Sequence, residues 1–137
     1  MRAAVALAAA LLSAAALAAP ALAGDAVTSR SSRFGTILFD KRSFVLYAFT
    51  SDKVGGKSTC YGACAKAWPP YIVKGAPPQG PKLGTTRRRD GKLQVTYAGR
   101  PLYYYVGDTQ PGLILCQNVE EFGGLWLVVR PSGKLVR

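Results

Sequence analysis

The chain has 137 residues, contains no histidine, and carries 18 Lys and Arg against 7 Asp and Glu, a formal net charge of +11 at pH 7. The absence of histidine excludes catalysis by a Ser-His or Cys-His pair and removes the commonest metal ligand. The positive charge favours anionic partners, or it serves only to keep the protein soluble.

The N-terminus has the three parts of a secretory signal: a basic start at Met1-Arg2, an apolar run over 3–19, and a small-x-small site that ends at Ala23. We therefore predict a signal peptide over 1–23 and export of the rest of the chain to the periplasm or the extracellular space. The alternative is an uncleaved anchor, but the run is rich in alanine and barely long enough to cross a bilayer. We expect no membrane span after cleavage.

The residues after the predicted cleavage site suffice for one small domain with a single core. Small polar residues predict a flexible leader over 24–33. A first repeat is expected over about 34–73 and a second over about 84–137. Between them, glycine and proline predict a stiff linker over 74–83.

The predicted elements after the leader are mostly strands. β-branched and aromatic residues over 36–39 and 43–49, separated by a polar turn, predict a first hairpin. Alanines over 60–67 predict one or two helical turns, which end before Pro69-Pro70. Three more hairpins are predicted over 85–97, 94–106 and 125–136. We therefore predict an all-β fold, a single compact domain of two pseudo-equivalent hairpin repeats with one short helix after the first repeat.

The sequence repeats itself at an offset of 56 residues. The segment LYAFTSD over 46–52 recurs as LYYYVGD over 102–108. The same offset pairs Cys60 with Cys116, and a tryptophan follows each copy. Internal repetition of this kind predicts two copies of one supersecondary unit that share a core.

The repeated segments contain aromatic pairs at alternate positions. Since side chains alternate across a strand, Tyr47 and Phe49 are expected on one face of the first copy, and Tyr103 and Tyr105 on one face of the second. One interpretation is that these rings fill a small core. The other is that they form an aromatic shelf for a sugar or a planar ligand.

Asp52 and Asp108 each lie three residues after the second aromatic residue of their copy. An aspartate at the end of a strand often accepts hydrogen bonds from nearby backbone N–H groups and fixes a turn. The alternative is a pair of carboxylates that the repeat brings together for metal binding or for acid-base chemistry.

Three cysteines follow the predicted signal peptide, and disulfides are expected in an exported protein. Cys60 and Cys64 are four residues apart, a spacing that on a helical turn lies within disulfide range. We predict this local pair. Because the copies match at Cys60 and Cys116, a bridge between these two is a rival that would leave Cys64 free.

Arg87, Arg88 and Arg89 lie beside the predicted Asp90-Gly91 turn. They are possible contacts for an anion. The alternative is a solvated hairpin edge whose charges block pairing with other strands.

The motifs Tyr47-x-Phe49-x-x-Asp52 and Tyr103-x-Tyr105-x-x-Asp108, with the segments around 57–70 and 122–126, resemble a family of bacterial secreted-repeat proteins of unknown function. Members are described as predicted lipoproteins with a conserved Y-x-[FWY]-x-x-D motif. The resemblance covers 34 to about 131 and implies an exported two-repeat β module without an established activity. The lipoprotein cysteine is missing here, so no lipid anchor is inferred.

We expect an exported, non-enzymatic envelope protein, a binding or structural module for anionic surface components such as lipopolysaccharide, anionic lipid or acidic glycan. The alternative is a redox or metal-handling protein that uses Cys60, Cys64 and Cys116. A third hypothesis is a hydrolase that uses Asp52 and Asp108. No catalytic residue, cofactor or metal is predicted, nucleic acid is not expected as a partner, and the oligomeric state is left open.

Overall fold

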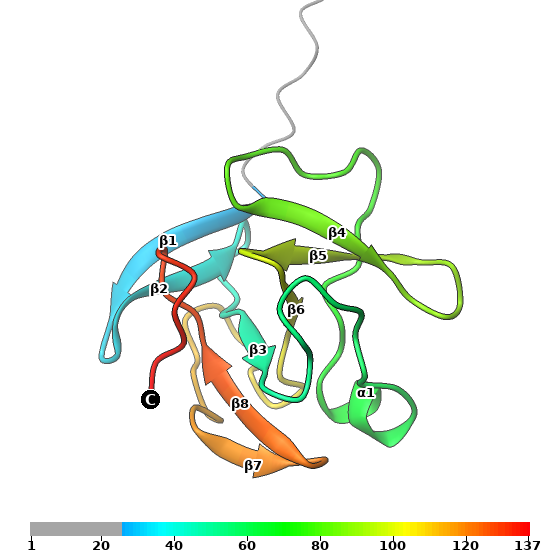
Figure 1. Cartoon of the computed structure of the whole chain (residues 1–137). Helices are drawn as coiled ribbons and strands as arrows, with labels where there is room; N and C mark the ends of the chain where they lie inside the picture. Colours follow the sequence, from blue (N-terminus) through cyan, green and yellow to red (C-terminus); the bar gives the residue numbers. More distant parts are fainter. Residues whose placement is uncertain (1–25) are drawn as a thin grey trace, which may run out of the picture.

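A computed structural model describes residues 26–137, so the predicted signal peptide over 1–23 lies outside the described residues. In chain order the elements are β1 (Val27–Ser32), β2 (Gly35–Asp40), β3 (Tyr47–Phe49), α1 (Ala63–Ala67), β4 (Leu83–Arg87), β5 (Leu93–Tyr97), β6 (Arg100–Tyr103), β7 (Val119–Glu121) and β8 (Gly124–Val128) (Figure 1). The predicted all-β class with one short helix is confirmed. Within this part of the chain, no helix is long and apolar enough to cross a membrane.

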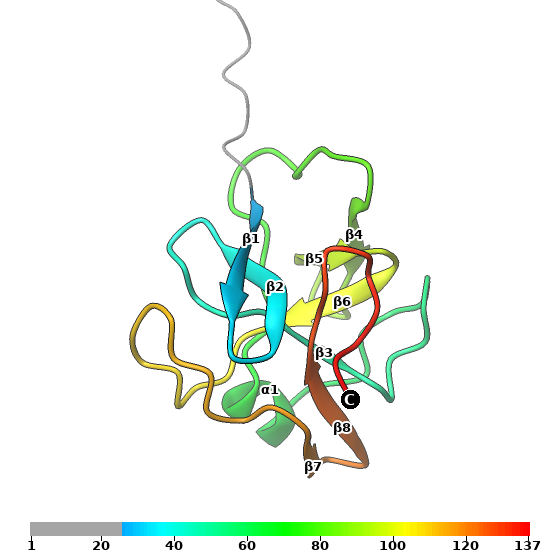
Figure 2. The ribbon, with the colours of Figure 1, turned by 90° about the vertical axis from the view of Figure 1, so that its left-hand side faces the viewer.

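The two repeats meet inside one six-stranded antiparallel sheet with the order β4-β5-β6-β3-β8-β7. At its centre, β3 of the first repeat pairs with β6 of the second, and Tyr47 lies opposite Tyr103. β3 also pairs with β8, so both of its neighbours in the sheet come from the second repeat. β1 and β2 form a separate hairpin. α1 and the β7–β8 hairpin lie at one end of the molecule, and the loop over 74–82 lies at the other (Figures 1 and 2).

The central strands are apolar on both faces because each face enters a different buried layer. Tyr47 and Tyr103 belong to the larger layer, whereas Ala48 and Leu102 belong to the smaller one. Strands that are covered on both sides lose the usual alternation of apolar and polar residues. This explains the uninterrupted apolar run at the centre of each sequence repeat.

A stack of aromatic rings that alternates between the repeats fills the larger layer. Phe49 lies nearly parallel to Trp126, with 4.1 Å between ring centroids, and Trp126 lies parallel to Trp68 at the same distance. Tyr105 packs on the far side of Trp68 at 4.8 Å. Phe49 and both tryptophans are at most 3% exposed, so these rings form the core and are not open to a ligand.

The motif tyrosines and aspartates form hydrogen bonds that cross between the repeats. The hydroxyl of Tyr47 donates to Oδ2 of Asp108 at 2.7 Å. The hydroxyl of Tyr103 donates to Oδ2 of Asp52 at 2.5 Å. All four side chains are buried, with exposed fractions from 0% to 6%. The tyrosine of each repeat therefore satisfies a buried carboxylate of the other repeat.

The second oxygen of each aspartate holds the loop after its own strand. Oδ1 of Asp52 accepts from the backbone N–H and the hydroxyl of Thr59, at 2.8 and 2.7 Å. Oδ1 of Asp108 accepts from the backbone N–H of Leu115 at 2.9 Å. Thr59 and Leu115 are 56 residues apart, the same offset as the motifs. These contacts are the turn-fixing role that aspartates take at strand ends.

The prediction of a flexible leader over 24–33 is wrong for Val27–Ser32, which forms β1. This strand pairs with β2 over six residue pairs, from Val27 opposite Asp40 to Ser32 opposite Gly35. Its side chains are half-buried or exposed, so it lacks the apolar pattern that would have identified it. Backbone hydrogen bonding to β2 therefore selects the strand here, against the local composition.

The four predicted hairpins are present, and the first and the last pair over fewer residues than predicted. β4, β5 and β6 form the two consecutive hairpins expected over 85–106. In the first repeat, the chain folds back on the end of β2. Phe39 and Val45 form a bridge, and hydrogen bonds on either side of it run from the Asp40 N–H to the Phe44 carbonyl and from the Leu46 N–H to the Leu38 carbonyl. Ser43 has a φ of 72°, a left-handed conformation that closes this turn, and its N–H donates to the carbonyl of Asp40 at 2.9 Å.

In the last predicted hairpin, Val129 and Leu135 form a bridge, and hydrogen bonds run from the Arg130 N–H to the Lys134 carbonyl and from the Val136 N–H to the Val128 carbonyl. β8 also pairs with β7, a strand that the sequence did not predict.

Replacing Tyr103 by Phe is expected to lower the free energy of unfolding by about 1–3 kcal/mol, because the buried carboxylate of Asp52 loses a hydrogen bond. Tyr47→Phe is expected to act in the same direction through Asp108. Chemical denaturation of the variants measures both. Tyr61→Phe is the control, since its hydroxyl takes part in an exposed contact of 3.1 Å. Losses equal to that of the control would contradict the account.

Candidate functional site

A groove of about 690 Å³ opens between the end of β2 and the segment 69–78. The turn after β2 forms one side, and the second side is a proline-rich stretch that includes part of the linker between the repeats. Ala26, Val95 of β5 and Tyr104, which follows β6, complete the lining. The groove therefore collects residues from both repeats.

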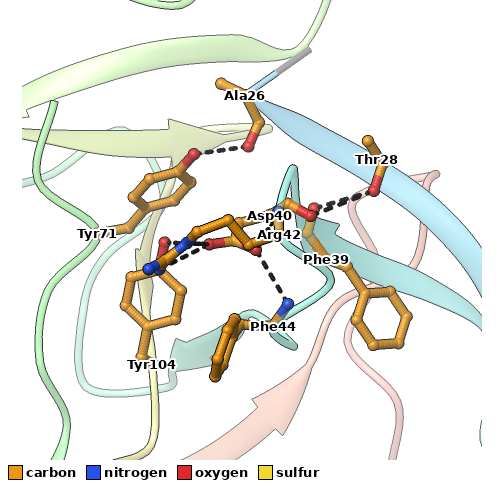
Figure 3. Close-up of polar contacts among 8 residues, drawn as sticks. All are labelled: Ala26, Thr28, Phe39, Asp40, Arg42, Phe44, Tyr71 and Tyr104. Carbon is orange, nitrogen blue, oxygen red and sulfur yellow. Dashed lines mark hydrogen bonds and ion pairs between the residues drawn. The ribbon is translucent and has the colours of Figure 1, made fainter. Parts of the chain in front are cut away.

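Tyr71 and Tyr104 line the groove and are referred to as its aromatic floor. Figure 3 shows both side chains beside Asp40 and Arg42. The rings of Tyr71 and Tyr104 lie 5.2 Å apart, with 56° between their planes. The hydroxyl of Tyr71 donates to the carbonyl of Ala26 at 2.7 Å, and that of Tyr104 donates to Oδ2 of Asp40 at 2.9 Å. Both rings are half-buried and are held at their tips by these bonds.

Asp40 is the acceptor that organises the site. Its side chain is 2% exposed. Oδ1 accepts from the backbone N–H groups of Arg42 and Phe44, both at 2.9 Å. Oδ2 accepts from Nε and Nη2 of Arg42, both at 3.0 Å, and from the Tyr104 hydroxyl. The carboxylate is therefore saturated with donors, and its role is to position Arg42 and Tyr104.

The guanidinium of Arg42 is fixed in place but open to solvent. Its side chain is 63% exposed, and its Cζ lies 4.9 Å from the ring centroid of Phe44 and 5.9 Å from that of Tyr104. Nε and Nη2 point to Asp40, which leaves further N–H groups of the fork free for an external acceptor. Lys41 and Lys74, both exposed, also line the groove.

The surroundings keep the tyrosines neutral. Burial raises the pKa of Tyr104 well above its ordinary value, and the charge of Asp40 adds to this effect. Burial also raises the pKa of Tyr71, with a further contribution from Asp40. Both hydroxyls therefore remain hydrogen-bond donors at any physiological pH.

The predicted anion contacts are only partly available. Arg88 is 5% exposed, and its guanidinium donates to Ser58 Oγ, to Gln94 Oε1 and to the carbonyl of Cys60, at 2.7 to 2.8 Å. The prediction that it contacts an external anion is thus wrong. Arg87 and Arg89 remain exposed.

The charge of Arg88 reaches a carboxylate through two hydroxyls. Ser58 Oγ lies 2.6 Å from the hydroxyl of Tyr103, whose proton goes to Asp52. Ser58 therefore donates to Tyr103, and Arg88 donates to Ser58. This chain of hydrogen bonds links the buried cation to the buried anion and explains why one arginine of the run points inward.

The other predicted site residues are structural. Cys60 and Cys64 form the predicted disulfide, with 5.3 Å between their Cα atoms, and Cys116 is a free, half-buried thiol. The disulfide removes Cys60 and Cys64 as metal ligands, so the metal-handling alternative fails for them. Residues 26–137 contain no group of three or more His, Cys, Asp or Glu placed to hold a metal ion.

Asp52 and Asp108, proposed above for hydrolysis, are each buried and already accept hydrogen bonds at both oxygens. Burial raises the pKa of Asp108. Neither carboxylate borders the groove.

The groove itself was not predicted from the sequence. Its central pair, Asp40 and Tyr104, lies 64 residues apart. The available signal is the polar Asp40-Lys41-Arg42 turn, whose pattern by itself predicts only a hairpin connection. Tyr104 faces away from the motif tyrosines on either side of it, so the repeated motif gives no signal for its role.

A family model described as a secreted repeat of unknown function matches the chain twice, over residues 28–71 and 84–130. The first match contains β3 and the second contains β6, the two strands that meet at the centre of the sheet. Comparison with curated proteins and with solved structures finds no match.

The free energy of unfolding is expected to fall as the pH rises above about 10, the ordinary pKa of tyrosine. Burial raises the pKa of Tyr47, Tyr103 and Tyr104 in the folded protein. Below about pH 10 these groups are protonated in both states and their full contribution is present. Above it they ionise only in the unfolded chain, which costs folding about 1.4 kcal/mol per pH unit for each group.

Urea denaturation between about pH 9 and 11.5 measures this decline, and Tyr104→Phe is expected to make it shallower by the share of one group. A stability that stays constant across this range would contradict the assignment. So would tyrosinate absorbance from all seven tyrosines while the protein is still folded.

Proposed function

The chain belongs to the family of secreted repeats of unknown function, and from that premise we propose that it is an exported, non-enzymatic protein that binds an anionic component of the cell envelope. In this proposal it acts outside the cytoplasm, in the periplasm or the extracellular space. The family description supports export, and the distribution of charge over the described residues supports binding to an anion.

The fold draws carboxylates inward and leaves cations outside. The chain has 7 Asp and Glu. Asp25 lies outside the described residues, three of the others are buried (Asp40, Asp52 and Asp108), and three are exposed (Asp90, Glu120 and Glu121). Of the 17 Lys and Arg side chains within 26–137, 14 are exposed. Exposed cations therefore outnumber exposed carboxylates by 14 to 3, whereas over all of residues 26–137 the ratio is 17 to 6.

Most of these cations have no carboxylate beside them. Over residues 26–137 one ion pair forms, between Arg42 and Asp40. Unpaired surface cations produce a positive potential that attracts polyanions and speeds their encounter, and salt screens it over about 8–10 Å. The absence of histidine and the full hydrogen bonding of the buried carboxylates support the non-enzymatic part of the proposal.

The mature protein is expected to bind lipopolysaccharide, phosphatidylglycerol vesicles or polygalacturonate at about 20 mM salt, and to release the bound anion as the salt approaches about 500 mM. Phosphatidylcholine vesicles and dextran are the uncharged controls, and sedimentation or light scattering measures the binding. If the protein bound none of the three anionic probes at low salt, the proposal would be overturned. Equal binding to the uncharged controls would overturn it as well.

A further inference from the structure

The groove over Tyr71 and Tyr104 has an aromatic floor, an apolar wall and a cationic rim. Its wall includes the proline and alanine side chains of the segment 69–78. Its rim carries Arg42, Lys41 and Lys74. The carboxylate at its base, Asp40, is 2% exposed and fully engaged, so three cations face the groove against one shielded anion.

The floor is arranged in advance for a ring-shaped ligand. The hydroxyls of Tyr71 and Tyr104 are both bonded to protein acceptors, so a ligand in the groove meets ring carbons of these two side chains and no free hydroxyl. Fixed rings lose little conformational entropy when a ligand binds. The faces carry negative partial charge and attract the C–H groups on the flat side of a pyranose.

Arg42 supplies a fixed partner for a carboxylate. Its fork is oriented by Asp40 through Nε and Nη2, and the N–H groups left over point away from that carboxylate. A guanidinium fork matches the geometry of a carboxylate, and such charge-assisted hydrogen bonds are about twice as strong as neutral ones. Lys41 and Lys74 add charge on the same groove for neighbouring acidic groups of a polymer.

Size and polarity select among anionic ligands. The volume of about 690 Å³ lies within the usual range for ligand sites and is far larger than a lone phosphate or carboxylate requires. An acyl chain would leave the cationic rim unmatched along its length. A sugar ring with a carboxylate uses the floor and the rim together.

We propose that this groove binds a uronic acid unit of an acidic glycan, with the sugar ring on Tyr71 and Tyr104 and the carboxylate on Arg42. The inference rests on the proposed function, because it gives the anionic component a site and a chemical class. Lys41 and Lys74 hold the charges of the adjacent sugar units.

The test compares two pairs of lysine substitutions that change the net charge equally. Lys41→Gln with Lys74→Gln removes two cations from the groove, whereas Lys53→Gln with Lys57→Gln removes two exposed cations from the loop after β3. Isothermal titration with tri-galacturonate measures the affinity, with maltotriose as the neutral sugar. The groove pair is expected to weaken binding about 10-fold, and the control pair less than about 2-fold.

A second comparison tests the aromatic floor. Tyr71→Phe keeps the ring and is expected to hold the affinity within about 2-fold, whereas Tyr71→Leu removes the ring and is expected to lower it about 10-fold. Near-ultraviolet circular dichroism checks that each variant is folded. If the leucine variant does not fold, the lysine comparison decides alone.

The outcomes separate this inference from the proposed function. Equal losses in both lysine pairs would overturn the groove and leave general anion binding intact. Binding to phosphatidylglycerol vesicles without binding to tri-galacturonate would overturn the sugar assignment. If inorganic phosphate at equal concentration displaced tri-galacturonate, the site would be one for simple anions, and the sugar assignment would be overturned. A wild-type protein that binds no anionic probe would remove both proposals.

Discussion

The hydrogen bonds that cross between the repeats are the constraint on which the rest of this structure depends. A buried carboxylate is costly unless donors satisfy it, and here the decisive donor for Asp52 and for Asp108 is a tyrosine of the other repeat. Those tyrosines stand opposite each other on the two central strands, and the edges of their rings pack on Trp68 and Trp126. Each repeat satisfies Oδ1 of its own aspartate but supplies no donor to Oδ2, so the buried carboxylates are fully paired only when both copies fold together.

The same constraint shapes the surface and hence the function. Because the fold uses Asp52, Asp108 and Asp40 as internal acceptors, few carboxylates remain outside to neutralise the cations. Asp40 differs from the other two because its donors lie beside a groove. Through these hydrogen bonds, the buried carboxylate of Asp40 positions the exposed guanidinium of Arg42 and the half-buried ring of Tyr104. The burial of these three aspartates therefore explains both the hydrogen bonding of the interior and the excess of cations on the surface.

The sequence predicted much of the fold, because the features involved are local or repeated. The offset of 56 residues revealed two units with a common core, and the spacing of Cys60 and Cys64 revealed the disulfide. The sequence does not predict β1, because backbone pairing with β2 specifies this strand and its side chains are mostly polar. Arg88 was misplaced because three adjacent arginines were interpreted as one surface run, although alternation along an extended chain turns one of them inward. The groove is not predictable from the sequence because Asp40, Tyr71 and Tyr104 come together only through the tertiary fold.

A double-mutant cycle on the free energy of unfolding tests the crossed arrangement most directly. Tyr47→Phe and Asp108→Asn, made singly and together, are expected to show a coupling of about 1–3 kcal/mol, because the two side chains share one buried hydrogen bond. Tyr47→Phe and Asp52→Asn, which belong to one repeat and share no such bond, are expected to add within about 0.5 kcal/mol. The opposite result, coupling within a repeat and additivity between repeats, would contradict the account.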